Sequence, residues 1–592
     1  MQTYILPKPL FLRSFNGKFE FLNPELIIKG NDNRVNAAAE RLYADFSDKT
    51  ATPTGVLEIT FANGKDEKYS LVINESGIKI TAESAAGAFY GVQTLRQLLM
   101  QSNKLDYILI HDRPELKFRG FYHDVTRGRI PTVETLKKLV DKLSLYKINV
   151  LQLYVEHSFD FKEYKEINKD QEPLTAAEIK ELSEYCRERF IDLQPSLSCF
   201  GHLYALLQSE NYKHLCELED YFPSKHLWNE RMAHHTIDAT NPESLKLVKS
   251  LIDQYLSVYN SDFFNICCDE TFDLGKGRNS GKDSGILYID FVSQIIKYLE
   301  GKGKTVMLWG DVILYHIDLL PKLSDKAIFL NWNYCDNVNY EQIHKITAAG
   351  KKQILCPGTS GWCRLIEYLP LANENIRRMA LFAKMDSALG LLNTNWGDFG
   401  HFCNIENASH GLILGAAEAW NPGAADNDYF DRAVCILNYR CNDLTPIKVL
   451  ELLNKSDEMG ILTQVLNLCG TKLYSGYEFK VEQLGGEKLK NLITDCKNAE
   501  NMIFKKTGEG EFESKTADSF LSAATGYKLM LQGLDIYCNH SEYPGWKNEF
   551  AVWKEKFSRA WQEENKKDEL PILLEFLDDF SAIVFEETVD NR

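Results

Sequence analysis

At 592 residues the chain is too long for one ordinary domain, and roughly two to four domains are expected. Hydrophobic residues make up 44% of it and charged residues 26%, proportions that are typical of globular proteins and exclude a disordered or fibrous chain. The formal net charge of −17 predicts an acidic surface, so neither nucleic acid nor a membrane is expected as a partner.

The cysteines and the N-terminus bear on metals and on the compartment. The 14 cysteines include no CxxC pair, so we expect reduced, buried thiols and no structural metal site. No apolar run is long enough to predict a transmembrane helix. Residues 1–5 lack the features of a signal peptide, which indicates a cytoplasmic protein; a secreted protein whose signal has been removed has the same appearance.

Residues 1–113 predict a small N-terminal α+β domain. Residues 57–61 and 69–73 alternate in polarity as half-buried strands do, and residues 77–81 form a third such run. Ser84 then precedes a helical pattern over residues 85–100. Strands followed by a helix favour an α+β unit.

Residues 114–425 change to a repeated pattern of strand, loop and helix. Several of the strands are apolar on both faces, as buried parallel strands are. Eight such units match the size of a (β/α)8 TIM barrel. A doubly wound open sheet is the alternative, but no GxGxxG loop follows the first strand. The predicted strands are residues 118–126, 149–156, 192–198, 263–269, 305–311, 327–334, 352–359 and 390–396.

Residues 426–592 predict a C-terminal helical domain. Helical patterns cover residues 446–458, 486–504, 515–537, 546–561 and 570–584. No catalytic constellation occurs among them, so packing, walling of the barrel or formation of a homodimer is the expected role. Trp420, which follows the last barrel strand on a helical pattern, is expected in the core.

The ends of the predicted strands carry acids, histidines, one arginine and four tryptophans. In a (β/α)8 barrel the chemistry lies at these carboxyl ends. Trp faces stack on sugar rings, while carboxylates and Arg bind hydroxyl groups, so the mixture predicts a carbohydrate site. One Trp alone is more often part of a core. The residues are Asp124, Arg127, Glu156, His157, His202, Asp269, Glu270, Trp309, Asp311, Trp332, Tyr334, Trp362, Trp396 and Asp398.

Asp269 and Glu270 are the sharpest feature, because they follow the apolar run of residues 263–268. The dipeptide alone fits a helix cap or the start of a polar loop about as well as it fits a catalytic pair. Its place at the end of the fourth strand favours catalysis, since buried acids are costly unless they are paired or functional. Glycoside hydrolysis needs two carboxyl groups, and unequal surroundings let one deliver a proton while the other stays ionised.

These residues resemble glycoside hydrolase family 20, the β-N-acetylhexosaminidases, over roughly residues 55–425. The segment SAAGAFYGVQTL at residues 84–95 is similar to the helix of the family's N-terminal domain, and Asp112-Arg113-Pro114 and Arg119-Gly120-Phe121 to its entry into the barrel. The barrel motifs that match are Asp124-Val125-Thr126-Arg127, Gly201-His202, Asp269-Glu270 and Trp396-Gly397-Asp398.

The resemblance implies release of terminal β-linked GlcNAc or GalNAc with retention of configuration and with no cofactor or metal. The 2-acetamido oxygen of the substrate would attack the anomeric carbon and form an oxazolinium ion. Glu270 would protonate the leaving oxygen and later activate water, and Asp269 would orient the acetamido N–H. Arg127 would bind sugar hydroxyls, with Trp309, Trp332 and Trp362 around the acetamido group.

The chain departs from the family pattern at three places. Asn265-Ile266-Cys267-Cys268 stands where the family has His-x-Gly-Gly. The acetamido-binding Tyr of the seventh strand has no match, and Trp362 or Tyr334 is the candidate substitute. Asp398 replaces a Glu, which leaves the preference between GlcNAc and GalNAc open.

Three other functions remain open. A catalytically silent glycan-binding protein on the same barrel would not need the acid pair. A metal-dependent (β/α)8 hydrolase usually carries His-x-His on the first strand, where this chain has His123 alone. A glycosidase with an enzymic nucleophile would act on sugars that lack the 2-acetamido group.

Overall fold

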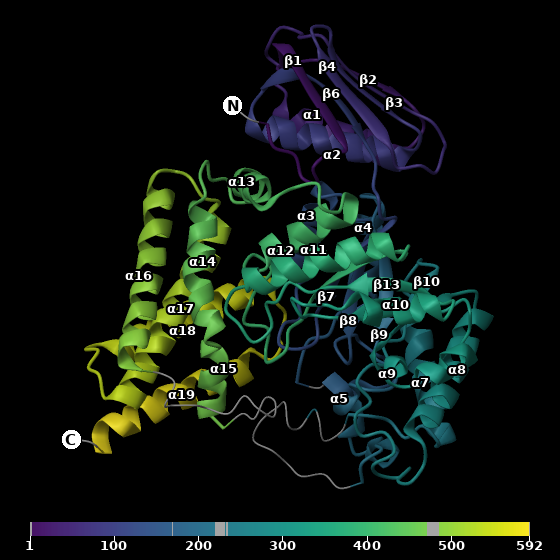
Figure 1. Cartoon of the computed structure of the whole chain (residues 1–592), viewed down its shortest axis with the longest axis vertical. Helices are drawn as coiled ribbons and strands as arrows, with labels where there is room; N and C mark the ends of the chain where they lie inside the picture. The colour runs from purple at the N-terminus through teal and green to yellow at the C-terminus, as the bar shows by residue number, and fades with distance from the viewer. Residues whose placement is uncertain (1–2, 169, 220–230, 232–234, 471–484, 591–592) are drawn as a thin grey trace.

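The computed structural model describes residues 3–168, 170–219, 231, 235–470 and 485–590. A layered α/β unit lies at one end of a closed barrel, and a group of long helices runs along the side of that barrel (Figure 1). None of the helices in the described part of the chain combines the length and the apolar character that crossing a membrane requires.

The N-terminal unit is a six-stranded sheet with α1 (Asn33–Phe46) and α2 (Ala85–Gln101) on one face (Figure 1). Its strand order is β1-β6-β4-β5-β3-β2. The three predicted strands and the predicted helix are present, and the Ser84 hydroxyl accepts the amide hydrogen of Gly87 as the cap of α2. The strands are β1 (Phe11–Glu20), β2 (Glu25–Lys29), β3 (Val56–Phe61), β4 (Tyr69–Asn74), β5 (Gly77–Ala82) and β6 (Lys104–Asp112).

Buried Asp112 joins this sheet to the barrel. Its carboxylate accepts hydrogen bonds from the Tyr69 hydroxyl at 2.7 Å, the Trp420 indole at 2.9 Å and the Lys147 ammonium at 3.2 Å. Buried charges need such partners, and here they come from both units. Trp420 is fully buried, as predicted.

The eight predicted parallel strands close into a barrel, so the (β/α)8 prediction is confirmed and the open-sheet alternative is wrong. Around the barrel the order is β10-β11-β12-β13-β14-β7-β8-β9. The strands are β7 (Phe118–Asp124), β8 (Val150–Val155), β9 (Asp192–Leu197), β10 (Phe263–Asn265), β11 (Thr305–Trp309), β12 (Ile328–Trp332), β13 (Lys352–Cys356) and β14 (Gly390–Asn395).

Strand β10 is shorter than the predicted residues 263–269, because it ends at Asn265. The backbone φ angles of Cys267, Cys268 and Glu270 are +55°, +65° and +50°. Left-handed residues cannot continue a strand ladder. Asp269 and Glu270 therefore lie on a coiled segment beyond the strand.

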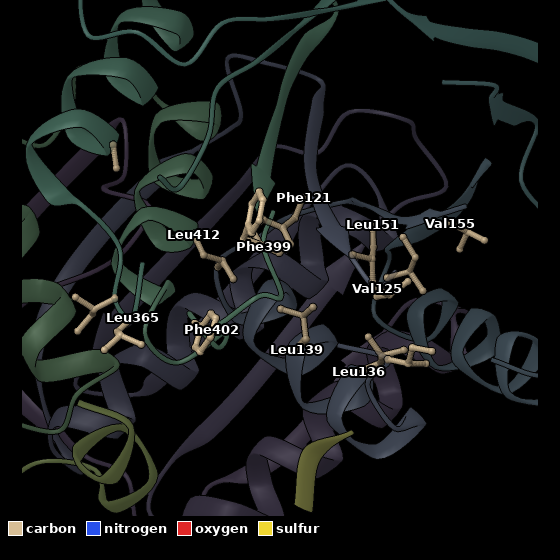
Figure 2. Close-up of a cluster of buried hydrophobic side chains, with 14 of the residues drawn as sticks. Phe121, Val125, Leu136, Leu139, Leu151, Val155, Leu365, Phe399, Phe402 and Leu412 are labelled. Atoms are coloured by element: carbon tan, nitrogen blue, oxygen red, sulfur yellow. The ribbon is translucent and has the colours of Figure 1, made fainter. Parts of the chain in front are cut away.

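Helices surround the barrel because each buries one apolar stripe against it. In α3 (Val133–Leu145) the buried residues Leu136, Leu139, Val140 and Leu143 recur at helical spacing. Figure 2 shows Leu136 and Leu139 on the side of α3 that faces Val125 and Leu151. The other barrel helices are α4 (Ala176–Arg187), α5 (Tyr204–Leu207), α7 (Pro242–Leu256), α8 (Ser284–Gly301), α9 (Asp311–Tyr315), α10 (Tyr340–Ala348), α11 (Leu369–Met385) and α12 (Ser409–Trp420).

The predicted C-terminal helices are present and pack along the barrel (Figure 1). The Tyr527 hydroxyl accepts the amide hydrogen of Leu365 at 2.9 Å, and the Asn454 side chain accepts that of Leu369 at 2.9 Å. These helices thereby hold the loop after β13, which carries Trp362. They are α13 (Asn427–Leu437), α14 (Thr445–Glu458), α15 (Ile461–Leu468), α16 (Gly486–Gly508), α17 (Ser514–Asn539), α18 (Trp546–Glu564) and α19 (Leu570–Asp590).

Candidate active site

Ten of the fourteen strand-end residues named from the sequence gather at the carboxyl ends of the barrel strands, in two groups that the Tyr154 ring connects through its contacts with His202 and Trp396. His202 contacts both acids, and Arg127 joins Asp398 to the Trp396 ring. From Trp396 the contacts continue to the aromatic side chains on three neighbouring strand ends. Those side chains are Trp309, Trp332, Tyr334 and Trp362.

The two acids occupy different surroundings. The Asp269 residue is 8% exposed, and its Oδ1 atom is buried with no hydrogen-bond partner among the described residues. The Glu270 side chain is 32% exposed. Its backbone is fixed on both sides, because its N–H donates to Asp311 Oδ2 at 2.9 Å and its carbonyl accepts from His235 Nε2 at 2.9 Å. One acid is thus enclosed, and the other opens to solvent from a rigid backbone.

His202 lies between the two acids. Its Nε2 atom is 3.3 Å from Asp269 Oδ2 and 3.4 Å from Glu270 Oε2. Burial by itself would lower the pKa of His202, but the charges of Asp269 and Glu270 outweigh it and raise that pKa well above the ordinary value. The imidazole is therefore expected to be protonated, as a cation placed between two carboxyl groups.

Glu156 is a strand-end residue to which the sequence analysis gave no specific role. Its Oε1 atom accepts a hydrogen bond from the Tyr154 hydroxyl at 2.8 Å and lies 3.9 Å from His202 Nδ1. Burial raises the pKa of Glu156, and the charge of His202 opposes that rise. Three carboxyl groups therefore surround the His202 imidazole: Asp269 and Glu270 near Nε2, and Glu156 near Nδ1.

Arg127 sits in a cage of acids and rings. Its Nε donates to Asp124 Oδ2 at 2.7 Å, and Nη1 lies 2.6 Å from Asp398 Oδ1. The guanidinium carbon is 4.8 Å from the centre of the Trp396 ring and 5.0 Å from that of Tyr154. Burial opposes the charge, but Asp124 and Asp398 outweigh it and raise the pKa of Arg127 well above its usual range. Arg127 and Asp398 are thus held together as a preorganised ion pair.

The aromatic residues differ in exposure. Trp309 is fully buried, packs 5.7 Å from the Trp396 ring, and has an indole N–H without a hydrogen-bond partner in the described structure. Trp332, Tyr334 and Trp362 are partly buried, and the first two stack with ring centres 5.2 Å apart. The Tyr334 hydroxyl oxygen accepts the Trp396 indole N–H at 2.6 Å, so its own hydrogen can be donated elsewhere.

Asp311 is a second residue whose role only the structure indicates. It begins α9, is partly buried, and accepts the Glu270 amide hydrogen through Oδ2. Burial, reinforced by the charge of Asp269, raises the pKa of Asp311 from 3.8 to about 7. This carboxyl, which is hydrogen-bonded to the Glu270 backbone, is therefore expected to change charge near neutral pH.

We expect Asp311 to make stability depend on pH. Because its folded pKa of about 7 exceeds the ordinary value of 3.8, the folded state holds the proton more tightly. The resulting stabilisation is complete below about pH 4 and is lost as the pH rises through about 7. Melting temperatures of wild type and Asp311→Asn should be measured from about pH 4 to 8. The melting temperature of the wild type should fall relative to that of the variant as the pH rises. A difference that does not change with pH would contradict this assignment.

Cys267 and Cys268 occupy backbone positions that favour glycine. Both are fully buried, and Cys267 Sγ lies 3.4 Å from the Ser196 hydroxyl. Burial raises the pKa of the Cys267 thiol to about 12, so it stays protonated. Glycine adopts a left-handed backbone without strain, because it has no Cβ atom. Cys267 and Cys268 adopt the same backbone with a Cβ atom, and this strains both residues.

At Cys268 we expect glycine to be tolerated better than alanine. Both substitutions remove the thiol, but only glycine relieves the left-handed φ of +65°, a difference of about 1 kcal/mol in the free energy of unfolding. Urea denaturation of Cys268→Gly and Cys268→Ala measures it. Cys186, buried within helix α4, is the matched control, where alanine should be the more stable variant. Equal ranking at the two positions would refute the strain argument.

His202, Asp269 and Glu270 also form the one group in the described part of the chain whose ligand atoms could surround a metal ion, all within 4.8 Å. The raised pKa of His202 works against that use, because a protonated imidazole has no lone pair to give. The same distances fit an ion-paired triad of one histidine and two carboxylates.

Comparison with known proteins assigns the chain to a family. Residues 116–378 match the model "Glycosyl hydrolase family 20, catalytic domain" and residues 2–113 match "Glycosyl hydrolase family 20, domain 2", which together exceed half of the chain. A β-hexosaminidase of Porphyromonas gingivalis is 26% identical over 335 residues, which are 50% of this chain and 41% of that protein. The β-hexosaminidase subunit beta of Entamoeba histolytica is 27% identical over 327 residues, covering 50% and 55%.

The chain spans about half the length of the curated relatives that it matches. Among solved structures, a chitobiase of Flavobacterium johnsoniae is similar over 98% of this chain and 99% of its own, with a TM-score of 0.63 and 18% identity. That similarity concerns the fold. With both family domains matched in sequence, in the order in which the sheet and the barrel occur, the chain belongs to glycoside hydrolase family 20.

Proposed function

We propose that the protein is a retaining exo-β-N-acetylhexosaminidase that releases terminal β-linked GlcNAc or GalNAc from glycans by substrate-assisted catalysis. The observation that carries this proposal is the unequal placing of the two acids around His202. Asp269 keeps one buried oxygen without a partner, which suits an acetamido N–H, while the carboxyl of Glu270 is open to a leaving group. Family membership and the β-hexosaminidases that match support the same reaction.

In the first step, the acetamido oxygen forms a bond to the anomeric carbon as the glycosidic C–O bond breaks. Glu270 gives its proton to the departing oxygen, and Asp269 Oδ1 accepts the acetamido N–H as positive charge develops on the oxazolinium ion. In the second step, Glu270 takes a proton from water, whose oxygen attacks the anomeric carbon on the face that the leaving group vacated, opposite the acetamido oxygen, and so breaks the bond between that oxygen and the anomeric carbon. Two inversions give retention.

The remaining residues of the cluster would hold the sugar. Arg127 and Asp398, already paired, would bind hydroxyls of the terminal sugar. Trp396 would offer a ring face, and the Tyr334 hydroxyl, which accepts the Trp396 indole N–H, would donate its own hydrogen to the acetamido carbonyl in the role that the family gives to a tyrosine of the seventh strand. This set needs no cofactor.

The direct experiment is hydrolysis of p-nitrophenyl N-acetyl-β-glucosaminide, followed by proton NMR in the presence of EDTA. We expect the β-anomer of GlcNAc to appear first and the rate to be unaffected by the chelator. An initial α-anomer would exclude a retaining mechanism. Activity that vanishes with EDTA and returns with zinc would instead favour the metal-dependent hydrolase.

A further inference from the structure

Phe272 is an exposed aromatic residue beside the candidate acid. It is 49% exposed, whereas its neighbours Thr271 and Asp273 are buried. Its N–H donates to the Glu270 carbonyl at 2.7 Å, so a tight turn of the backbone links the two residues. A single exposed apolar residue is ordinary in itself. This one lies two residues beyond the group that we propose to protonate the leaving oxygen.

The orientation of the Phe272 ring is fixed by the same network that holds Glu270. The ring stacks on His235 with centres 5.5 Å apart and planes 16° apart. His235 Nε2 donates to the Glu270 carbonyl at 2.9 Å, and its ring meets that of His202 edge-on at 4.3 Å. One face of Phe272 is therefore covered by His235.

The loop that carries Phe272 is itself rigidly held. Fully buried Glu217 accepts the backbone N–H groups of Gly275, Gly277 and Asn279 through one oxygen, at 3.2, 3.2 and 3.1 Å. Its other oxygen accepts from the Asn279 side chain at 2.6 Å. These hydrogen bonds to Glu217 restrict the conformation of the loop. The Phe272 ring is therefore expected to stay exposed at the surface.

We propose that Phe272 is the platform on which the leaving-group sugar stacks. The terminal sugar would occupy the cluster of Arg127 and Trp396, and Glu270 must reach the oxygen that links the two sugars. The second sugar then lies on the exposed side of Glu270, where the Phe272 ring meets its C–H face. This inference rests on the proposed function and adds to it a preference for sugar leaving groups over groups without a ring.

The test compares two substrates in Phe272→Ala. The first substrate is chosen from disaccharides in which a terminal GlcNAc is β-linked to different hydroxyls of a second sugar, and the one that the wild type cleaves fastest is used. The second substrate is N-acetyl-β-glucosaminyl fluoride, whose leaving group has no ring. We expect kcat/KM to fall about 10-fold for the disaccharide and to stay unchanged for the fluoride. Phe272→Trp, which keeps an aromatic ring, should cleave the disaccharide at about the rate of the wild type. Phe15→Ala, which removes a 48% exposed phenylalanine from β1, is the matched control and should change neither rate.

The outcomes separate the inference from the proposed function. An equal loss on both substrates would assign Phe272 a structural role, and no loss on either would remove it from the site, so each overturns the inference while hydrolysis by the wild type stands. A wild type that cleaves neither substrate would overturn the proposed function, and the platform with it.

Discussion

Replacement of Glu270 by glutamine is expected to lower kcat for β-GlcNAc disaccharides by about 10³-fold, the contribution typical of a positioned general acid. The amide keeps the size of the side chain and has no proton to give. The Glu270 backbone is fixed by Asp311 and His235, so the substituted side chain should stay in place. Steady-state kinetics with a sugar leaving group measures the loss.

The leaving group provides the internal control for Glu270→Gln. Fluoride needs little help from an acid, so single-turnover release of fluoride from N-acetyl-β-glucosaminyl fluoride should be affected much less than cleavage of the disaccharide. Equal losses on both would mean that Glu270 does not act as the acid. If wild type and variant bind GlcNAc equally well and cleave equally poorly, the protein is better described as a glycan-binding protein.

Asp269→Asn is expected to lower kcat/KM on N-acetylglucosaminides by at least about 10²-fold, because the charge that stabilises the oxazolinium ion is lost. The buried Oδ1 atom of Asp269, which has no partner among the described residues, is the acceptor that we assign to the acetamido N–H. An asparagine can still accept one hydrogen bond there, but it supplies no negative charge. The loss should therefore appear mainly in kcat.

Two comparisons make the Asp269 prediction decisive. Asp386→Asn replaces an acid that is also 8% exposed but lies just after α11, where it bonds Gln353 and His344, and it should leave kcat unchanged. A β-glucoside, which lacks the acetamido group, should not be hydrolysed by wild type or variant. A glucoside cleaved as fast as the N-acetylglucosaminide would favour an enzymic nucleophile over substrate assistance.

The barrel was predictable because buried strands have a simple sequence pattern. Strands that are covered on both faces read as apolar runs, and all eight were identified. Strand β1 left no such record, because nearly all of its residues are exposed and it shows no alternation in polarity. It belongs to the sheet through its pairing with β6, about 90 positions away along the chain, and pairing over that distance has no local signature.

The sequence by itself determined the barrel, the acid pair at the end of its fourth strand and the residues gathered around it, since composition and periodicity record which strands are buried and where they end. Only the tertiary structure decided how the pair is supported. Asp311, 41 positions from Glu270, binds its backbone, and Glu156 approaches His202 from another strand. Cys267 and Cys268 adopt a left-handed backbone that favours glycine, and Cys267 contacts Ser196 on another strand, a spatial neighbour that a local sequence pattern does not record.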